Sequence, residues 1–264
     1  MNEITENKLN EILNDRLSGS RDILIKINTF FYENFNSIED FPSLLLRLKK
    51  QFYMFHAIIE YLSELEEIYL TQGKDEVYNF IRNFFSTERN VYDRIYKNFK
   101  KSVKKIKNII TISNSRTVLE ILERIYRDNK RITVTVCESR PQNEGRILAE
   151  SLLDTGIKVN FITEAMIPQF AEAADLALTG ADTVLKNGNI VNKTGTKLLA
   201  IACKYYKTPF YVLADKSKLK NSDKFHPKEE SKEEIWNFKH PKLRIENYYF
   251  EIIEKKLITK IIYD

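Results

Sequence analysis

The sequence contains few of the residues that build disulfide or metal frameworks. Its 264 residues include two cysteines, three histidines and one tryptophan. Cys137 and Cys203 lie inside apolar segments, which argues against a disulfide scaffold and against a cysteine-ligated zinc site. His56, His226 and His240 have no spacing typical of metal ligands. We therefore expect no metal ion and a reducing, cytoplasmic location.

Long apolar runs are also absent. No stretch approaches the roughly 20 residues that span a bilayer, and Met1-Asn2-Glu3 does not begin a secretory signal, so no membrane partner is expected. Hydrophobic residues (43%) and charged residues (30%) occur at globular levels. The 42 Lys and Arg residues exceed the 37 Asp and Glu residues only slightly, and the net charge of +5 is spread along the chain. Direct nucleic-acid binding is therefore not expected.

The hydrophobic pattern divides the chain near residue 107. In residues 1–106, large apolar side chains recur at three- and four-residue steps between Phe30 and Leu62, which predicts helices that pack into a core. In residues 107–264, short apolar runs alternate with helical patterns. The chain also exceeds the usual single-domain length of roughly 100 to 200 residues. We predict a helical domain over 1–106 and an α/β domain over 107–264.

The second domain has the pattern of a parallel sheet. Helices predicted at 115–127 and 143–154 separate short apolar strands, which are predicted at 108–112, 131–137, 158–162 and 176–181. Such alternation gives right-handed crossovers and a mainly parallel, Rossmann-like sheet with helices on both faces. No G-x-G-x-x-G follows the first strand, so no dinucleotide cofactor is expected.

Asp182 stands at the carboxyl end of the strand predicted at 176–181. Open parallel sheets bind ligands outside these strand ends, so Asp182 is a candidate ligand contact. A helix is predicted to begin at Thr194-Gly195-Thr196, and its free N–H groups together with Lys193 favour an anion such as phosphate. Gly195 would let that anion approach the backbone. The alternative is an ordinary helix start capped by Thr194, with Asp182 as a turn residue.

Polar residues follow the other predicted strands at the same edge of the sheet. They are Ser113, Asn114, Ser115 and Arg116 after the first strand, and Glu138, Ser139 and Arg140 after the second. The carboxyl ends of parallel strands lie along one edge, so these side chains are expected to share a crevice with Asp182.

Four segments, in order along the chain, resemble the signatures of one protein family. They are I-I-T-I-S-N-S at 109–115, V-T-V-C-E-S-R-P-Q-N-E-G at 134–145, G-A-D with N-G and N-K-T-G-T at 180–196, and T-P-F-Y-V-L-A-D at 208–215. On these motifs the chain is identified as a member of the family that contains the alpha, beta and delta subunits of translation initiation factor 2B, methylthioribose-1-phosphate isomerase and ribose-1,5-bisphosphate isomerase.

The resemblance implies a site for a small phosphorylated ligand. By analogy, Arg140 clamps phosphate or sugar hydroxyls, and Asn192 and Lys193 close the opposite side of the crevice. A guanidinium suits such bidentate contacts. The alternative for Arg140 is a structural ion pair with Glu138 or Glu144.

A second phosphate contact is implied near the amino terminus. The segment L-S-G-S-R-D at 17–22 resembles a degenerate form of the family's R-G-A phosphate loop, which implies Ser18, Gly19 and Ser20 as ligand contacts. The arginine of that motif is missing at position 17, where leucine stands. This departure argues against a full second phosphate subsite.

The chain departs from the isomerases of the family at the position of their cysteine. Their pattern is like I-L-T-H-C-N, and Ser113 stands where that cysteine would be. Moving a proton between adjacent carbons needs an acid and a base with suitable pKa values, and serine is a poor substitute for a thiol. Of the acid and base that this reaction needs, the chain retains only Asp182. Cys137, at the end of another strand, is a weak alternative thiol, whereas Cys203 is predicted to lie in the core.

Two functions remain. Ser113 resembles the noncatalytic branch, so the first is an archaeal-type initiation factor 2B alpha-like regulatory protein that binds a sugar phosphate or nucleotide. That resemblance implies a homodimer formed by the α/β domain and an initiation factor 2 subunit as a possible partner. The second function is an aldose–ketose sugar-phosphate isomerase in which Asp182 is catalytic and Ser113 replaces the cysteine.

Overall fold

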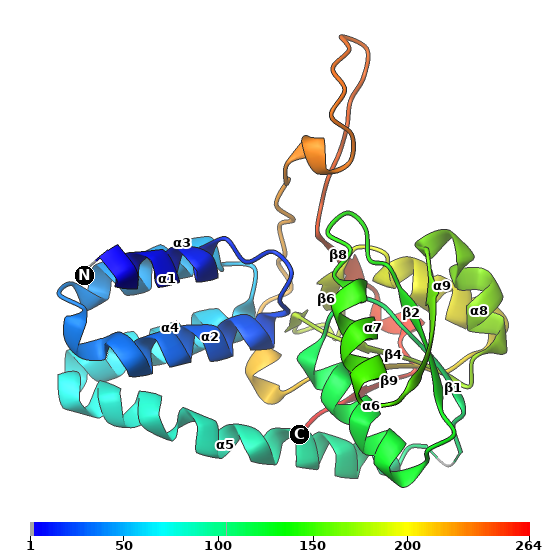
Figure 1. Cartoon of the computed structure of the whole chain (residues 1–264), viewed down its shortest axis with the longest axis horizontal. Helices are drawn as coiled ribbons and strands as arrows, with labels where there is room; N and C mark the ends of the chain where they lie inside the picture. The colour runs from blue at the N-terminus through cyan, green and yellow to red at the C-terminus, as the bar shows by residue number, and fades with distance from the viewer. Residues whose placement is uncertain (1–2, 104) are drawn as a thin grey trace.

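The structure of the protein is a computed structural model that describes residues 3–103 and 105–264, without the side chains of residues 85–89. A helical amino-terminal part is followed by a central sheet with its helices and by a smaller sheet (Figure 1). The helices of the first part are α1 (Glu3–Leu13), α2 (Ser20–Asn34), α3 (Phe41–Gln51), α4 (His56–Thr71) and α5 (Lys74–Lys100), with a 3-10 turn, η1 (Phe35–Ser37).

The second part contains the remaining elements. Its strands are β1 (Asn108–Thr111), β2 (Thr133–Cys137), β3 (Lys158–Ile162), β4 (Leu176–Gly180), β5 (Thr183–Val184), β6 (Ile190–Lys193), β7 (Phe210–Leu213), β8 (Phe250–Ile253) and β9 (Lys260–Ile262). Its helices are α6 (Arg116–Asp128), α7 (Gly145–Asp154), α8 (Ile167–Ala173) and α9 (Thr196–Tyr206), with the 3-10 turns η2 (Glu164–Met166), η3 (Lys216–Lys218), η4 (Lys232–Glu234) and η5 (Lys255–Leu257).

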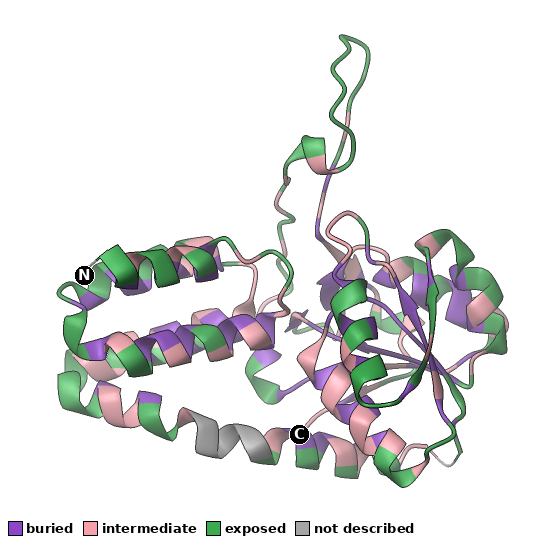
Figure 2. Ribbon diagram, in the orientation of Figure 1, coloured by how far each residue is buried: buried purple, intermediate pink, exposed green. Residues whose placement is uncertain are grey.

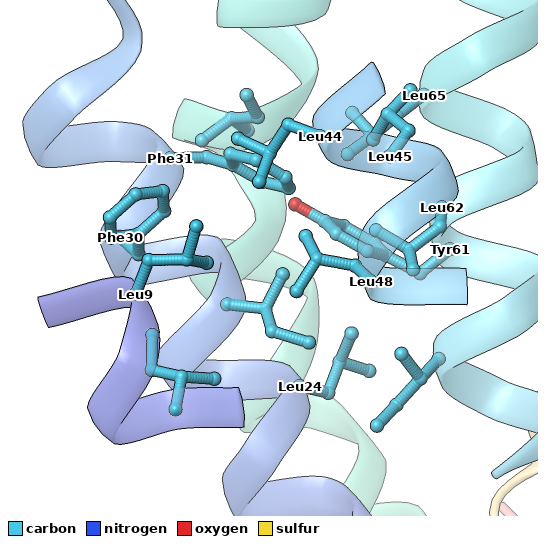
Figure 3. Packing of buried hydrophobic residues seen from close by; sticks show 14 of the residues in the cluster. Leu9, Leu24, Phe30, Phe31, Leu44, Leu45, Leu48, Tyr61, Leu62 and Leu65 are labelled. Carbon is cyan, nitrogen blue, oxygen red and sulfur yellow. The ribbon is translucent and has the colours of Figure 1, made fainter. Parts of the chain in front are cut away.

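The amino-terminal helices bury one apolar face each in a common core. Figure 3 shows Leu9 of α1, Phe31 of α2, Leu45 of α3 and Leu62 of α4 meeting there. Asp40 starts α3, because its carboxylate accepts a hydrogen bond from the Ser43 N–H at 3.0 Å. The predicted helical core is confirmed.

The central sheet has the strand order β3-β2-β1-β4-β7-β9, and every neighbouring pair is parallel. The order reverses between β1 and β4, because β2 and β3 extend from β1 while β7 and β9 extend from β4. Ligands of open α/β sheets bind at such a reversal, outside the carboxyl ends of the two strands. The fold therefore places a crevice after β1 and β4.

Helices cover both faces of this sheet. Successive strand residues point to opposite faces, so Ile109 packs in the core under α6 and α7 while Ile110 packs in the core under α8 and α9. The predicted Rossmann-like α/β class is confirmed, with β9 and the smaller sheet as additions that the sequence analysis missed.

Helix α5 joins the two parts. Val77 and Ile81, near its start, are buried in the amino-terminal core, whereas Ile95 and Phe99, near its end, are buried under the central sheet. One helix thus belongs to both cores, and the predicted division at residue 106 stays a prediction.

The smaller sheet is antiparallel, in the order β5-β6-β8. Its middle strand, β6, ends with Asn192 and Lys193, and β8 pairs with it from about 60 residues further along the chain. This sheet fixes those two residues beside the carboxyl end of β4. Within the described ranges, no helix combines the length and the apolar composition that a membrane crossing requires.

Adjacent residues of α3 provide a test of the amino-terminal core. Leu45 is fully buried and Leu46 is 69% exposed. Leu45→Ala should lower the free energy of unfolding by about 2 to 5 kcal/mol, because it removes buried apolar contacts and leaves a cavity. Leu46→Ala should change it by less than about 0.5 kcal/mol. Urea denaturation measures both, and equal losses would contradict the described orientation of α3.

Candidate functional site

A cavity lies at the strand reversal, between the carboxyl ends of β1 and β4 and the start of α2. It contains about 950 Å³ of space free of protein atoms, part of it open to solvent. The predicted site residues that line it are Ser18, Gly19, Ser20, Ser113, Asn114, Ser115, Asp182, Asn192 and Lys193. The structure thus brings together residues from the two predicted domains.

Two helices begin at this cavity. Gly19 is the N-cap of α2 and offers no side-chain cap, and the first N–H groups of any helix have no partner within the helix. Ser115 is the N-cap of α6, and its hydroxyl accepts a hydrogen bond from the Val118 N–H at 3.4 Å. The positive ends of both helices therefore point to the cavity, which favours an anionic ligand.

The start of α2 approaches the loop after β1 closely. A Cβ atom at Gly19 would lie 2.7 Å from the backbone oxygen of Asn114, a separation that side chains do not adopt. The Asn114 amide also donates a hydrogen bond to the Leu17 carbonyl at 3.4 Å. Glycine at position 19 is therefore required for the two loops to meet.

Buried charges connect α2 to the strand ends. Arg21 of α2 and Asp215, which follows β7, form an ion pair at 3.7 Å, and both are buried. Lys218 is also buried and donates a hydrogen bond from Nζ to the Ala181 carbonyl at 2.6 Å. Its charge acts on both Asp182 and Asp215.

The two aspartates differ in the direction of their pKa shifts. Burial dominates at Asp182 and raises its pKa, although Lys218, a hydrogen bond from Ser20 and Lys193 act in the opposite direction. Burial also acts on Asp215, but Lys218, Arg21 and Ser217 together outweigh it and lower its pKa. Asp215 is therefore the ionised partner in the ion pairs, while Asp182 retains a tendency to hold a proton at the cavity wall.

Ser113, Glu144 and Lys193 form a second polar group on the opposite wall. The Ser113 hydroxyl donates to Glu144 Oε1 at 3.0 Å, and Lys193 Nζ lies 3.0 Å from the same oxygen. Lys193 also lies over the ring of Tyr249, 4.9 Å from its centroid. Burial raises the pKa of Glu144, against the effects of Lys193 and Ser113. The other oxygen, Glu144 Oε2, is buried and has no hydrogen-bond partner among the described residues.

Asn192 has a structural role within this wall. Its Nδ2 donates to the hydroxyls of Thr179 at 2.9 Å and Thr196 at 3.0 Å. These bonds tie β6 to β4 and to the start of α9, and they hold the neighbouring Lys193 in place.

The start of α9 does not offer an external anion the free N–H groups that the sequence analysis predicted. The N–H groups of Gly195 and Lys197 donate to the Glu251 carboxylate at 2.7 and 3.0 Å, so the chain supplies its own anion from β8. Gly195, not Thr194, is the N-cap, with φ 102°, and the Thr194 hydroxyl donates to the Tyr248 carbonyl instead. The start of α9 does bind an anion, as a helix start favours, but the anion is the Glu251 side chain, 56 residues further along the chain.

Arg140 lies apart from the other predicted residues. It is exposed, it is not among the described residues that line the cavity, and it makes no ion pair with any described residue. Its suggested partners are occupied, since Glu138 pairs with Arg146 and Glu144 with Lys193. The preceding residue, Ser139, has a left-handed backbone with φ 69°, and its buried hydroxyl accepts a hydrogen bond from the Ser113 N–H.

The cysteines do not contribute to the cavity. Cys137 and Cys203 are buried, and neither lines it. Burial raises the pKa of both thiols, that of Cys203 to about 12. A neutral, enclosed thiol is a poor acid or base at neutral pH, so Cys137 does not replace the cysteine missing at Ser113.

Several residues of the cavity and of the ion pair beside it were missed in the sequence. Asp215, which pairs with Arg21 and does not itself line the cavity, follows a strand just as Asp182 does, so the same rule could have selected it. Glu144 was considered only as a partner of Arg140, although it stands in the quoted motif. Arg21 and Lys218 gave no local signal of their positions. The apolar part of the wall, made of Phe52, Met54, Phe55 and Phe250, combines distant segments.

The fold is that of an open α/β protein with a cavity at the strand reversal and a helical amino-terminal part beside it. Residues 41–264 match the Initiation factor 2 subunit family. The chain belongs to this family, and the resemblance inferred from the motifs is confirmed.

Two relatives of the chain carry different functional names. A Pyrococcus furiosus protein named translation initiation factor eIF-2B subunit 2-like is 44% identical over 158 residues, which are 58% of this chain and 55% of that protein. The chain thus spans about half the length of that relative. Ribose 1,5-bisphosphate isomerase of Methanocaldococcus jannaschii is 27% identical over 255 residues, covering 92% of this chain and 80% of the enzyme.

A solved structure has the same arrangement over nearly the whole chain. The translation initiation factor eIF-2B of Pyrococcus horikoshii superposes with a TM-score of 0.82 and 26% identity, covering 99% of this chain and 95% of that one. The helical part and the α/β part therefore occur together in a known member of this fold.

The opposite pKa shifts of Asp182 and Asp215 give a testable pH dependence. The raised pKa of Asp182 means that its carboxyl group binds a proton more tightly in the folded state than in the unfolded state. The free energy of unfolding of the parent protein therefore decreases as pH rises above 3.8 and this carboxyl group ionises. In urea denaturation, Asp182→Asn should therefore gain stability relative to the parent protein as pH rises above 3.8, and it should keep that gain at higher pH.

Asp215→Asn is the matched control for this measurement. Its lowered pKa stabilises the fold at all pH values above 3.8, and that stability is lost only as pH falls through the lower folded pKa. The variant should lose about 3 to 5 kcal/mol equally at pH 5 and pH 8, because it leaves buried cations without their partner. A relative loss for Asp182→Asn that grows with pH would contradict the assignment.

Proposed function

We propose that the protein binds a small phosphorylated ligand, a sugar phosphate or a nucleotide, in this cavity and acts as an initiation factor 2B-like regulatory protein in the cytoplasm. The observation that carries the proposal is the meeting of two helix starts with buried cations at the strand reversal. Helix starts and cations favour phosphate, and the carboxyl groups of Asp182 and Glu144 suit sugar hydroxyls. Ser113, in place of the isomerase cysteine, favours binding over turnover.

The proposed partners follow from the family. Its name and the solved eIF-2B relative support an initiation factor 2 subunit as a protein partner, and the resemblance of the α/β domain supports a homodimer. Ligand binding would act on the partner through α2, because this helix both lines the cavity and belongs to the amino-terminal core.

A second candidate function is the sugar-phosphate isomerase reaction. Glu144 favours it, because this carboxyl group lies beside Ser113 and in the same cavity as Asp182. In an aldose–ketose isomerisation one group removes the proton from carbon 2 while another protonates the carbonyl oxygen on carbon 1. The hydroxyl on carbon 2 then loses its proton as it becomes the new carbonyl, and a proton returns to carbon 1. Two carboxyl groups with raised pKa values could share these roles without a cysteine.

Thermal shift with ribose phosphates, methylthioribose 1-phosphate and nucleoside monophosphates tests the binding proposal. A ligand at about 100 times its dissociation constant should add roughly 2.7 kcal/mol of stability. Asp182→Asn should weaken binding about 10- to 100-fold, because it removes the carboxyl group proposed to bind a sugar hydroxyl. Asp75→Asn, at an exposed position near the start of α5 and away from the cavity, should bind like the parent protein. Equal shifts with unphosphorylated sugars would contradict phosphate recognition.

Product formation in the same samples separates the two functions. The regulatory protein should give stabilisation without product. If the protein is an isomerase, Glu144→Gln should reduce kcat by about 10²- to 10⁴-fold while the ligand-induced thermal shift remains. Turnover that survives in both Glu144→Gln and Asp182→Asn would exclude these residues as the acid and base.

A further inference from the structure

An arm projects from the α/β part between η4 and β8. We define it as residues 235–244, all ten of which are exposed (Figures 1 and 2). It carries four large apolar side chains, with exposed fractions of 37 to 57%: Ile235, Trp236, Phe238 and Leu243. The rings of Trp236 and Phe238 stack with centroids 4.7 Å apart. Clustered apolar groups on an exposed segment mark a contact surface.

The base of the arm is firmly attached. Asn247 is buried, and its Nδ2 donates to the Ser231 carbonyl at 2.7 Å and to Glu234 Oε2 at 2.8 Å. The Tyr249 hydroxyl donates to the same Glu234 carboxylate at 2.6 Å. The direction of the arm is therefore fixed by a polar cluster, and its apolar groups are held away from the body.

The arm has a distinct charge. Residues 235–244 contain Lys239, Lys242 and Arg244 and no acidic residue. The arm thus presents aromatic and aliphatic groups among cations, and a complementary surface would be apolar and acidic.

The outer face of α7 has this complementary character. Ile147 and Leu153 are 37% and 57% exposed, and Phe161 of the edge strand β3 is 46% exposed beside them. Glu150 and Asp154 are exposed on the same helix and form no ion pair with any described residue, whereas the exposed Arg146 of this helix already has Glu138 as its partner. Figure 1 shows the arm extending away from its own α7, so one chain does not cover this face itself.

We propose that the arm of one copy docks on the α7 face of a second copy, the two contacts being related by a two-fold axis. In such a dimer each copy donates one arm and accepts one, so both apolar surfaces are covered and the assembly closes. The docking places Lys239 and Lys242 against Glu150 and Asp154. The proposal rests on the homodimer of the proposed function and names the surfaces that form it.

Charge reversal tests the docking by sedimentation velocity in the absence of ligand. Reversing the acceptor, in Glu150→Lys with Asp154→Lys, should raise the dimer dissociation constant roughly tenfold or more through like-charge repulsion. Reversing the arm, in Lys239→Glu with Lys242→Glu, should do the same. The chain that carries all four changes should recover the dimer. Tyr205→Ser, at a 79% exposed position of α9, is the control and should leave dimerisation unchanged.

Trp236 reports on the contact directly, because it is the only tryptophan in the sequence. Its fluorescence should shift to longer wavelength in each two-residue reversal variant and return in the fourfold variant. The proposal would be overturned if the parent protein is a monomer, or if all of these variants still form the dimer. It would also be overturned if the arm binds only another protein or a nucleic acid. Thermal shift with phosphorylated ligands is measured separately, so failure of ligand binding would contradict the proposed function and leave the dimer result standing.

Discussion

The arrangement of this protein depends on the buried charges that hold the start of α2 against the ends of the central strands. Arg21 and Asp215 meet across the two parts of the molecule, and the buried charge of Lys218 acts on both Asp215 and Asp182. Burying such charges is unfavourable unless each has a partner. The cluster therefore fixes one position of the helical part, and that position closes the cavity over the strand reversal.

The same constraint prepares the cavity for an anion. The start of α2 can approach the loop after β1 because Gly19 has no side chain, and helix starts then face buried lysines across the cavity. Burial raises the pKa values of Asp182 and Glu144. Keeping such carboxyl groups buried lowers the stability of the fold, and functional sites commonly contain groups of this kind. Ser113 stands where the motif of the isomerases has a cysteine, and its hydroxyl donates to Glu144.

Much of the fold could be predicted because its signals are local. The strands β3 and β4 and the helix α6 follow from apolar runs and periodicity in the sequence itself. The predicted contact at Asp182 followed from the rule for strand ends. The start of α9 was interpreted wrongly because Glu251, which occupies it, is remote in sequence. Arg140 is exposed and follows a left-handed residue, Ser139, that no propensity indicates. Arg21 acquires its partner only when the two parts of the molecule meet.

The most direct test is a crystal structure of the protein with ribose 5-phosphate bound. The account predicts the phosphate within hydrogen-bond distance of the first N–H groups of α2, with sugar hydroxyls directed to Asp182 and Glu144. A phosphate bound outside the cavity, or at the start of α9 in place of the Glu251 carboxylate, would contradict it.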